Sequence, residues 1–271
     1  MVLVYNAKGA AQMNTKITLR IILIIFCILA VNSLVYAADR KEGGYYGTED
    51  RHRKYVRNFL KHFNYEQYYR SSYSQFTNNN DNYVDAMNLV YFSGHGNGHW
   101  RIQTAGTSGD GVVDFRSAGY SSNKGYGDKN LEFIVFHACD VIPGPRDVSD
   151  WWTPWVKNGG IFDGLHQALG FRSSCYGLSG PAIASYFGYR MKKDGTDKPS
   201  INIVYGGSAG QYQYRVWKTW LNAIRYKGMH FLSWNEYGSA VMYPGAENDT
   251  YSNVSPDPPE NHASLKIWYQ Y

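Results

Sequence analysis

Two short apolar runs constrain the fold of this 271-residue chain more than any other feature. They lie within "NLVYFSGHG", residues 88–96, and "LEFIVFHAC", residues 131–139. Each run is almost continuously apolar, which is typical of a strand buried on both faces of a parallel sheet. A parallel sheet of this kind needs helices between its strands, so the two runs favour the α/β class.

The rest of the chain alternates short strands with amphipathic helices, as that class requires. We expect helices over 49–63, 161–169, 180–193 and 213–228. Further strands are expected over 44–48, 170–175, 201–207 and 262–271. Two polar stretches, 74–83 and 104–130, are expected to be loops, the first on the surface. We find neither an internal repeat nor a linker beyond residue 37, which predicts one α/β domain with a mostly parallel central sheet.

The N-terminal segment has the layout of a secretory signal. Basic residues are followed by an apolar run over 21–31 and by small residues suited to cleavage after Ala37 or Ala38. The run is shorter than the roughly 20 residues needed to span a bilayer, which disfavours the alternative of an uncleaved anchor. We therefore expect a signal peptide over 1–37, with 1–12 as an upstream extension if Met13 is the start, and a secreted or cell-surface domain over 38–271.

Charge and cysteine content exclude two classes of protein. The whole chain has 27 basic and 22 acidic residues, a net charge of +5. Removing 1–37 takes away three basic residues and leaves +2, too little for a nucleic-acid-binding domain. Cys27 leaves with the signal, and the remaining Cys139 and Cys175 are too few for a disulfide scaffold. After signal cleavage we expect no membrane partner.

The two apolar strands end in side chains that suit nucleophilic catalysis. His95 follows the first strand and Cys139 follows the second. The carboxyl ends of parallel strands form the ligand crevice of such sheets, so an imidazole and a thiol are expected at one edge. An imidazole favours the thiolate and can protonate a leaving amine. Gly94 and Gly96 allow a sharp turn there, and the Gly96 amide is a candidate oxyanion donor.

The blocks "LVYFSGHG" and "EFIVFHAC" resemble the His-Gly and Ala-Cys motifs of the caspase, legumain and gingipain group of cysteine peptidases. The resemblance covers about residues 44–230, although only the two blocks are specific. It implies a caspase-like three-layer α/β/α fold and a catalytic dyad of His95 and Cys139. It also implies oxyanion donors at the Gly96 and Cys139 amides, a peptide or protein substrate, and no cofactor. The string "DWWTPWVKNGGIFDGLHQALGFRS" is similar instead to secreted microbial proteins of a family without an assigned function.

Two alternatives for the cysteines and histidines remain open. His95, His99, His137 and Cys139 together offer a zinc-ligand set, but the first two lie on a glycine-rich turn whose geometry is not preset. We therefore expect no metal and treat His99 and His137 as weak candidates for lining a substrate pocket. A Cys139–Cys175 disulfide is the second alternative. Because Cys175 lies farther into its loop, we expect the two cysteines to be out of register and free.

The cluster Trp151, Trp152 and Trp155 carries the rival functional hypothesis. It is a weak candidate substrate groove, and in a non-catalytic binding module it would contact glycans or a protein partner. The purely structural interpretation is a hydrophobic cap on the sheet. Asp163 is a weak candidate for binding a basic substrate side chain, since acidic residues in loops are usually solvated or capping. The tract "NNNDN" lacks the spaced ligands of a calcium loop and is expected at the surface.

Overall fold

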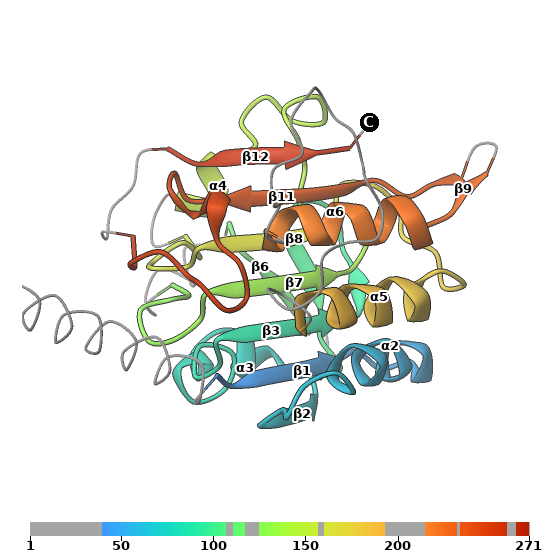
Figure 1. Cartoon of the computed structure of the whole chain (residues 1–271), viewed down its shortest axis with the longest axis horizontal. Helices are drawn as coiled ribbons and strands as arrows, with labels where there is room; N and C mark the ends of the chain where they lie inside the picture. The colour runs from blue at the N-terminus through green and yellow to red at the C-terminus, as the bar shows by residue number, and fades with distance from the viewer. Residues whose placement is uncertain are drawn as a thin grey trace, which may run out of the picture. The chain divides into compact units, whose positions relative to one another are not determined.

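The computed structural model describes residues 40–106, 111–116, 125–156, 160–192, 215–231, 234–258 and 264–270. Its centre is a seven-stranded sheet (Figure 1). The strands are β1 (Glu42–Tyr46), β2 (Gln67–Arg70), β3 (Leu89–Ser93), β7 (Phe133–His137), β8 (Gln167–Phe171), β11 (Gly238–Met242) and β12 (Lys266–Tyr269). Their order is β12-β11-β8-β7-β3-β1-β2. The five strands from β8 to β2 are mutually parallel, and β11 runs antiparallel to both its neighbours.

The two apolar runs identified in the sequence are the central pair of strands. β3 and β7 pair in parallel from Leu89 opposite Phe133 to Ser93 opposite His137, and every residue of both strands is buried. The mostly parallel sheet predicted from these runs is confirmed. Because both faces of the pair must be covered, the sheet is the middle of three layers.

Three long helices cover one face of the sheet (Figure 1). They are α2 (Asp50–Leu60), α5 (Gly180–Lys192) and α6 (Val216–Lys227). In α2 the apolar residues recur at helical spacing and point inward, which is why the sequence predicted this helix. The fully buried aromatic side chains of this core layer include Phe59, Tyr91, Phe133, Phe171, Phe187 and Trp220.

The opposite face is covered by a small sheet and by short helical segments. The small sheet consists of β4 (His95–Gly96), β5 (Arg101–Gln103) and β6 (Val112–Asp114), paired antiparallel. The segments are α3 (Tyr73–Phe76), η1 (Asn80–Asn82) and α4 (Thr153–Val156). Phe92, Phe115, Phe136 and Trp155 are among the core residues of this layer. The fold is therefore α/β with three layers, as expected.

Three short elements complete the described structure. They are the hairpin strands β9 (His230–Phe231) and β10 (Trp234–Asn235) and the turn η3 (Ala246–Asn248). None of the helices in the described ranges has the length and apolar content to cross a bilayer.

The helix expected over 161–169 does not form. The last residues of that range belong to strand β8, and the preceding ones form an irregular segment in which Phe162 bridges to Tyr126. Gly164 has a φ of 104°, and a Cβ there would lie 2.4 Å from the Gly127 carbonyl oxygen. Such a left-handed residue interrupts a helix, so the helical spacing of Ile161, Leu165 and Leu169 arises by coincidence. The strand expected over 170–175 accordingly begins earlier, at Gln167.

The polar stretch 74–83 is not simply a surface loop. Phe76 and Asn80 are buried, and the Asn80 side-chain amide donates to the carbonyl of Gly125 at 3.0 Å. The asparagine side chain thus satisfies a buried backbone group, which composition alone cannot indicate.

Lys41–Tyr271 form one compact unit. The proposed signal segment over 1–37 and the strand expected over 201–207 lie outside the described residues, so both remain predictions.

Candidate functional site

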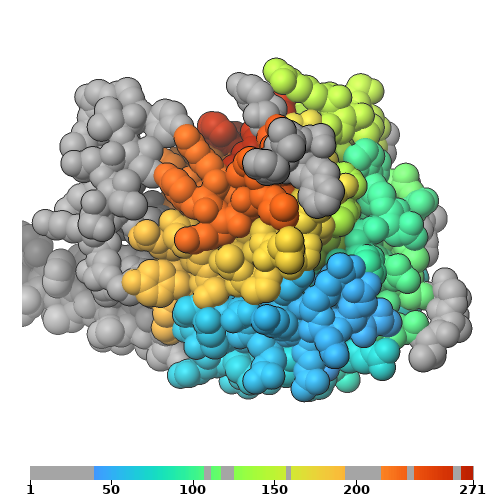
Figure 2. All heavy atoms as spheres, turned by 90° about the vertical axis from the view of Figure 1, so that its right-hand side faces the viewer, coloured from blue at the N-terminus to red at the C-terminus, as the bar shows by residue number. Residues whose placement is uncertain are grey.

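Four adjacent parallel strands deliver the functional side chains to one edge of the sheet. Glu49 follows β1, His95 follows β3, Cys139 follows β7 and Cys175 follows β8. Figure 2 shows this carboxyl edge, where the blue start of α2 meets the teal segment after β3 and the yellow segment after β8. The expected meeting of an imidazole and a thiol at this edge is borne out by the topology.

Backbone contact holds the segments of His95 and Cys139 together. The Gly94 amide donates to the His137 carbonyl at 3.3 Å, which extends the β3–β7 pairing beyond the strands. A Cβ on Gly96 would lie 1.7 Å from the carbonyl oxygen of Cys139, so only glycine allows this approach. His95 and Cys139 consequently line the same narrow pocket.

The pocket wall comes from four parts of the fold. Its residues are Arg51, His52 and Tyr55 of α2, Gly94 and His95 after β3, His137 and Cys139 at the end of β7, and Cys175, Tyr176 and Gly177 after β8. His95 reaches solvent, since 40% of its side-chain surface is exposed. The pocket is therefore open to a substrate at the position of the imidazole.

Cys175 is the main partner of the Cys139 thiol. The two sulfur atoms lie 3.1 Å apart, and the Cys175 amide donates to the Cys139 sulfur, also at 3.1 Å. The Cys175 thiol hydrogen bond lowers the pKa of Cys139 to about 7; burial opposes this change, while the Cys175 amide adds to it and His95 contributes less. The pKa of Cys175 is raised well above its ordinary value by its bond to Cys139 and by burial. Cys139 is thus the more acidic of the two thiols, and Cys175 is the donor when Cys139 is ionised.

The expectation that the two cysteines lie out of register is wrong. The backbone pairs beyond β7 and β8, because the Asp140 amide donates to Ser173 at 3.1 Å and the Ile142 amide donates to Phe171 at 3.0 Å. This pairing carries Cys175 back to Cys139. Both cysteines are nevertheless free in the structure, as expected.

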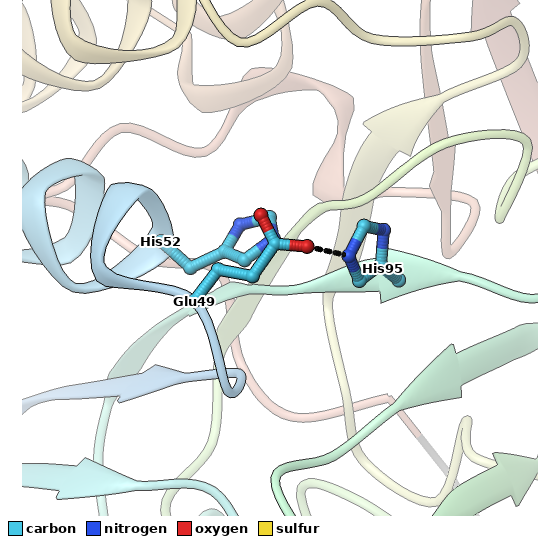
Figure 3. Close-up of side chains that lie close together, drawn as sticks. All are labelled: Glu49, His52 and His95. Carbon is cyan, nitrogen blue, oxygen red and sulfur yellow. Dashed lines mark hydrogen bonds and ion pairs between the residues drawn. The ribbon is translucent and has the colours of Figure 1, made fainter.

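Glu49 orients the His95 imidazole, a role that the sequence analysis missed. Its carboxylate is hydrogen-bonded to Nε2 of His95 (Figure 3), and its other oxygen forms an ion pair with Nε of Arg51 at 2.5 Å. The bond to His95, helped by Arg51, lowers the pKa of Glu49 against the opposing effect of burial. An ionised Glu49 fixes a proton on Nε2 and leaves Nδ1 for the pocket. The available signal was its position three residues after a strand of the sheet.

His52, on the first turn of α2, is a second imidazole beside His95. Its ring centroid lies 5.1 Å from that of His95, and its Nδ1 lies 3.0 Å from the Ser93 hydroxyl oxygen. Only 5% of the residue is exposed. Burial, together with the nearby His95 and Arg51, lowers the pKa of His52 to about 4, so its imidazole is neutral at pH 7.

His137 and His99 have structural contacts. His137 is buried, its Nδ1 is bonded to the Tyr91 hydroxyl, and burial lowers its pKa to about 3. It lines the pocket as a neutral ring. His99 Nδ1 lies 3.0 Å from the Asp140 carbonyl oxygen and supports the loop after β7. The zinc set of His95, His99, His137 and Cys139 is therefore not assembled.

The tryptophan cluster and Asp163 do not line this pocket. Trp155 is fully buried against Phe115 and Phe162, so its assignment as a substrate-binding residue is wrong. Asp163 precedes β8, and its amide bonds to Tyr126 in the segment before β7, which places it at the opposite edge of the sheet. That assignment is also wrong.

Trp151 and Trp152 keep partial exposure, but Trp151 packs against the core layer that contains Trp155. Neither is a wall residue of the pocket at Cys139. These contacts favour the hydrophobic cap over a binding surface for this cluster.

The chain belongs to the family described as a domain of unknown function, DUF6345, whose model matches residues 27–270. That match covers nearly all of the compact unit, including Glu49, His95, Cys139 and Cys175. No curated protein matches the sequence.

Proposed function

We propose that this DUF6345 protein is a secreted cysteine peptidase-like hydrolase that cleaves peptide bonds with Cys139 as nucleophile and His95 as acid and base. The observation that carries the proposal is the contact of Gly96 with the Cys139 backbone, which brings the imidazole and the thiol into one pocket. A Cys139 pKa of about 7 supplies thiolate at neutral pH. Export is inferred from the signal-like segment over 1–37.

Acylation begins with attack of the Cys139 thiolate on the carbonyl carbon of the substrate. The carbonyl π electrons move to oxygen, and the amides of Gly96 and Cys139 are the proposed donors to the resulting oxyanion. Collapse of the intermediate breaks the C–N bond, and protonated His95 gives the Nδ1 proton to the leaving amine.

Deacylation uses the same imidazole as a base. Neutral His95 takes a proton from water at Nδ1, and the hydroxide formed attacks the thioester carbonyl. The intermediate collapses to a carboxylic acid and the Cys139 thiolate, which restores the starting thiolate and imidazolium pair. Throughout, Glu49 accepts from Nε2–H and holds the ring, which makes it a positioning residue.

A test is labelling of the purified protein by a mixed-sequence library of peptidyl acyloxymethyl ketones, read out by mass spectrometry. Cys139 should be modified in the wild type, and the Cys139→Ala variant should remain unlabelled. His95→Ala should slow peptide hydrolysis by roughly 100-fold or more, the usual contribution of general acid–base catalysis. Modification of Cys175 with Cys139 inert under reducing conditions would show that the dyad is assigned incorrectly.

A further inference from the structure

Glu49, His52 and His95 form a cluster of metal-binding groups at the mouth of the pocket (Figure 3). Each residue offers one nitrogen or oxygen atom, and the three atoms lie within 4.8 Å of one another. Glu49 and His52 are one helical turn apart at the start of α2, whereas His95 comes from β4. Two separate elements therefore converge on one point, as ligands of a metal do.

His52 supplies an independent sign that something is bound there. Its Nδ1 contacts the Ser93 hydroxyl, while its Nε2 has no hydrogen-bond partner among the described residues and is shielded from water. An unpaired buried polar group destabilises the folded protein, so this nitrogen calls for a partner. With the proton on Nδ1, Nε2 carries the lone pair that a metal ion needs.

The orientation of Glu49 also suits the binding of a metal ion. Arg51 occupies Oε2 of the carboxylate, which leaves Oε1 directed at His95 within the cluster. Through this ion pair Arg51 neutralises part of the local charge. A carboxylate oxygen and two imidazole nitrogens match the ligand preference of Zn²⁺, whereas Ca²⁺ and Mg²⁺ prefer oxygen ligands alone.

We propose that Glu49, His52 and His95 bind a zinc ion, and that the bound ion switches off the His95 imidazole. Zinc binding itself is independent of the proposed hydrolase function; only the inhibition rests on it. This departs from the sequence-based expectation that the protein takes no metal.

The inhibition follows from the two ring nitrogens of His95. A zinc ion at Nε2 replaces the hydrogen bond to Glu49 and keeps the single ring proton on Nδ1. The imidazole then has no free lone pair with which to accept a proton from water. It also cannot become an imidazolium, so it no longer acts as the base and acid of the dyad.

The experiment measures zinc binding to the purified, reduced full chain by competition with a chelating fluorophore. The test variant is His52→Asn, because the asparagine side chain can still bond Ser93 but does not reach the position of Nε2. We expect one zinc equivalent bound by the wild type and at least about 100-fold weaker binding by H52N. Mutating a residue that only hydrogen-bonds to a metal ligand already lowers metal affinity by about 10–100-fold, and H52N removes a ligand itself. Equal affinities of the two proteins would overturn the proposal.

Two further variants locate the bound metal. Cys139→Ala/Cys175→Ala removes the paired thiols and should still bind one zinc equivalent; loss of binding there would assign the metal to the thiols instead. If H52N does not fold, as judged by its melting transition, Glu49→Gln provides the test at a half-exposed position and should also weaken zinc binding. Undiminished affinity in E49Q would count against the site.

Labelling of Cys139 separates the two proposals. If zinc binds and slows labelling in the wild type, both stand. If zinc binds and the zinc-free protein shows no reactivity at Cys139, the metal site stands and the hydrolase fails. If Cys139 reacts but no zinc binds at a large excess of the ion, the hydrolase stands and the metal site is wrong.

Discussion

The sulfur atoms of Cys139 and Cys175 lie 3.1 Å apart, and both the thiol and the backbone amide of Cys175 face the Cys139 sulfur. In a typical cysteine–histidine pair the imidazole is the chief stabiliser of the thiolate. Here the first cause of the lowered pKa is the second cysteine, and His95 contributes least among the causes that lower it. In the proposed mechanism, Cys175 therefore stabilises the thiolate and His95 supplies the acid–base catalysis.

Cys175→Ala should make the Cys139 thiol less acidic. The change removes the thiol donor, so the pKa of Cys139 should rise from about 7 toward its ordinary value near 9. The rate of alkylation by iodoacetamide, followed against pH, should show a midpoint shifted upward by at least half a unit. Cys175→Ser keeps a hydroxyl donor and is the matched control, with a smaller shift. A midpoint unchanged in C175A would mean that Cys175 does not stabilise the thiolate.

Oxidation should join the two cysteines. A disulfide needs a sulfur–sulfur distance of about 2.05 Å, so the sulfurs at 3.1 Å have to close by about 1 Å. One equivalent of hydrogen peroxide oxidises the two thiols to a disulfide and is reduced to two molecules of water. Alkylation under non-reducing conditions should then fall from two modified cysteines to none and recover after treatment with a reductant. A stable sulfenic acid on Cys139, with Cys175 still alkylated, would contradict this geometry.

The parts of the fold that the sequence predicted are those dictated by burial. β3 and β7 are covered on both faces, so almost every position in them must be apolar. Such a continuous apolar run can be recognised in the amino-acid sequence without a structure. The meeting of His95 and Cys139 follows from that placement, because the ends of adjacent parallel strands share an edge.

The parts that escaped prediction depend on contacts between loops. Glu49 at the start of α2 looks like any acidic residue favoured by the helix dipole, and only the structure brings His95 to it. Cys175 reaches Cys139 through the Asp140–Ser173 backbone bond, which leaves no sequence signal. Gly164 breaks a range whose apolar spacing is helical, and its left-handed φ depends on its contact with Gly127.

Gly96→Ala should disrupt the site. The added methyl would lie 1.7 Å from the Cys139 carbonyl oxygen, so one of the two segments has to move. We expect overpacking to lower the free energy of unfolding by about 1–3 kcal/mol, and labelling of Cys139 to be slower. Gly106→Ala is the control, because its methyl would meet nothing closer than 3.6 Å and its φ is ordinary. Wild-type labelling in G96A would show that the Gly96–Cys139 contact is not needed.

At the opposite edge of the sheet, a buried histidine lies among three carboxylate groups. His166 is fully buried, and its Nδ1 lies 2.6 Å from a carboxylate oxygen of Asp249. Its Nε2 faces Glu132 at 3.2 Å and the exposed Asp257 at 3.7 Å. Burial lowers the pKa of His166, but the bond to Asp249 and the three carboxylates outweigh it and raise the pKa above its ordinary value near 6.5.

This raised pKa predicts how the free energy of unfolding depends on pH. The folded protein holds the His166 proton more tightly than the unfolded chain, so the contribution is fully present below pH 6.5 and is lost as the pH rises through the folded-state pKa. Asp249→Asn removes the main charge partner and should cost roughly 3 kcal/mol at pH 6, with a smaller difference from wild type at pH 9. Urea unfolding of both proteins at each pH measures this. Glu247→Gln, which breaks the partly exposed pair with Lys266, is the control and should cost less than about 1 kcal/mol at either pH. A deficit in D249N that stays constant from pH 6 to pH 9 would contradict the predicted loss of the His166 proton over this range.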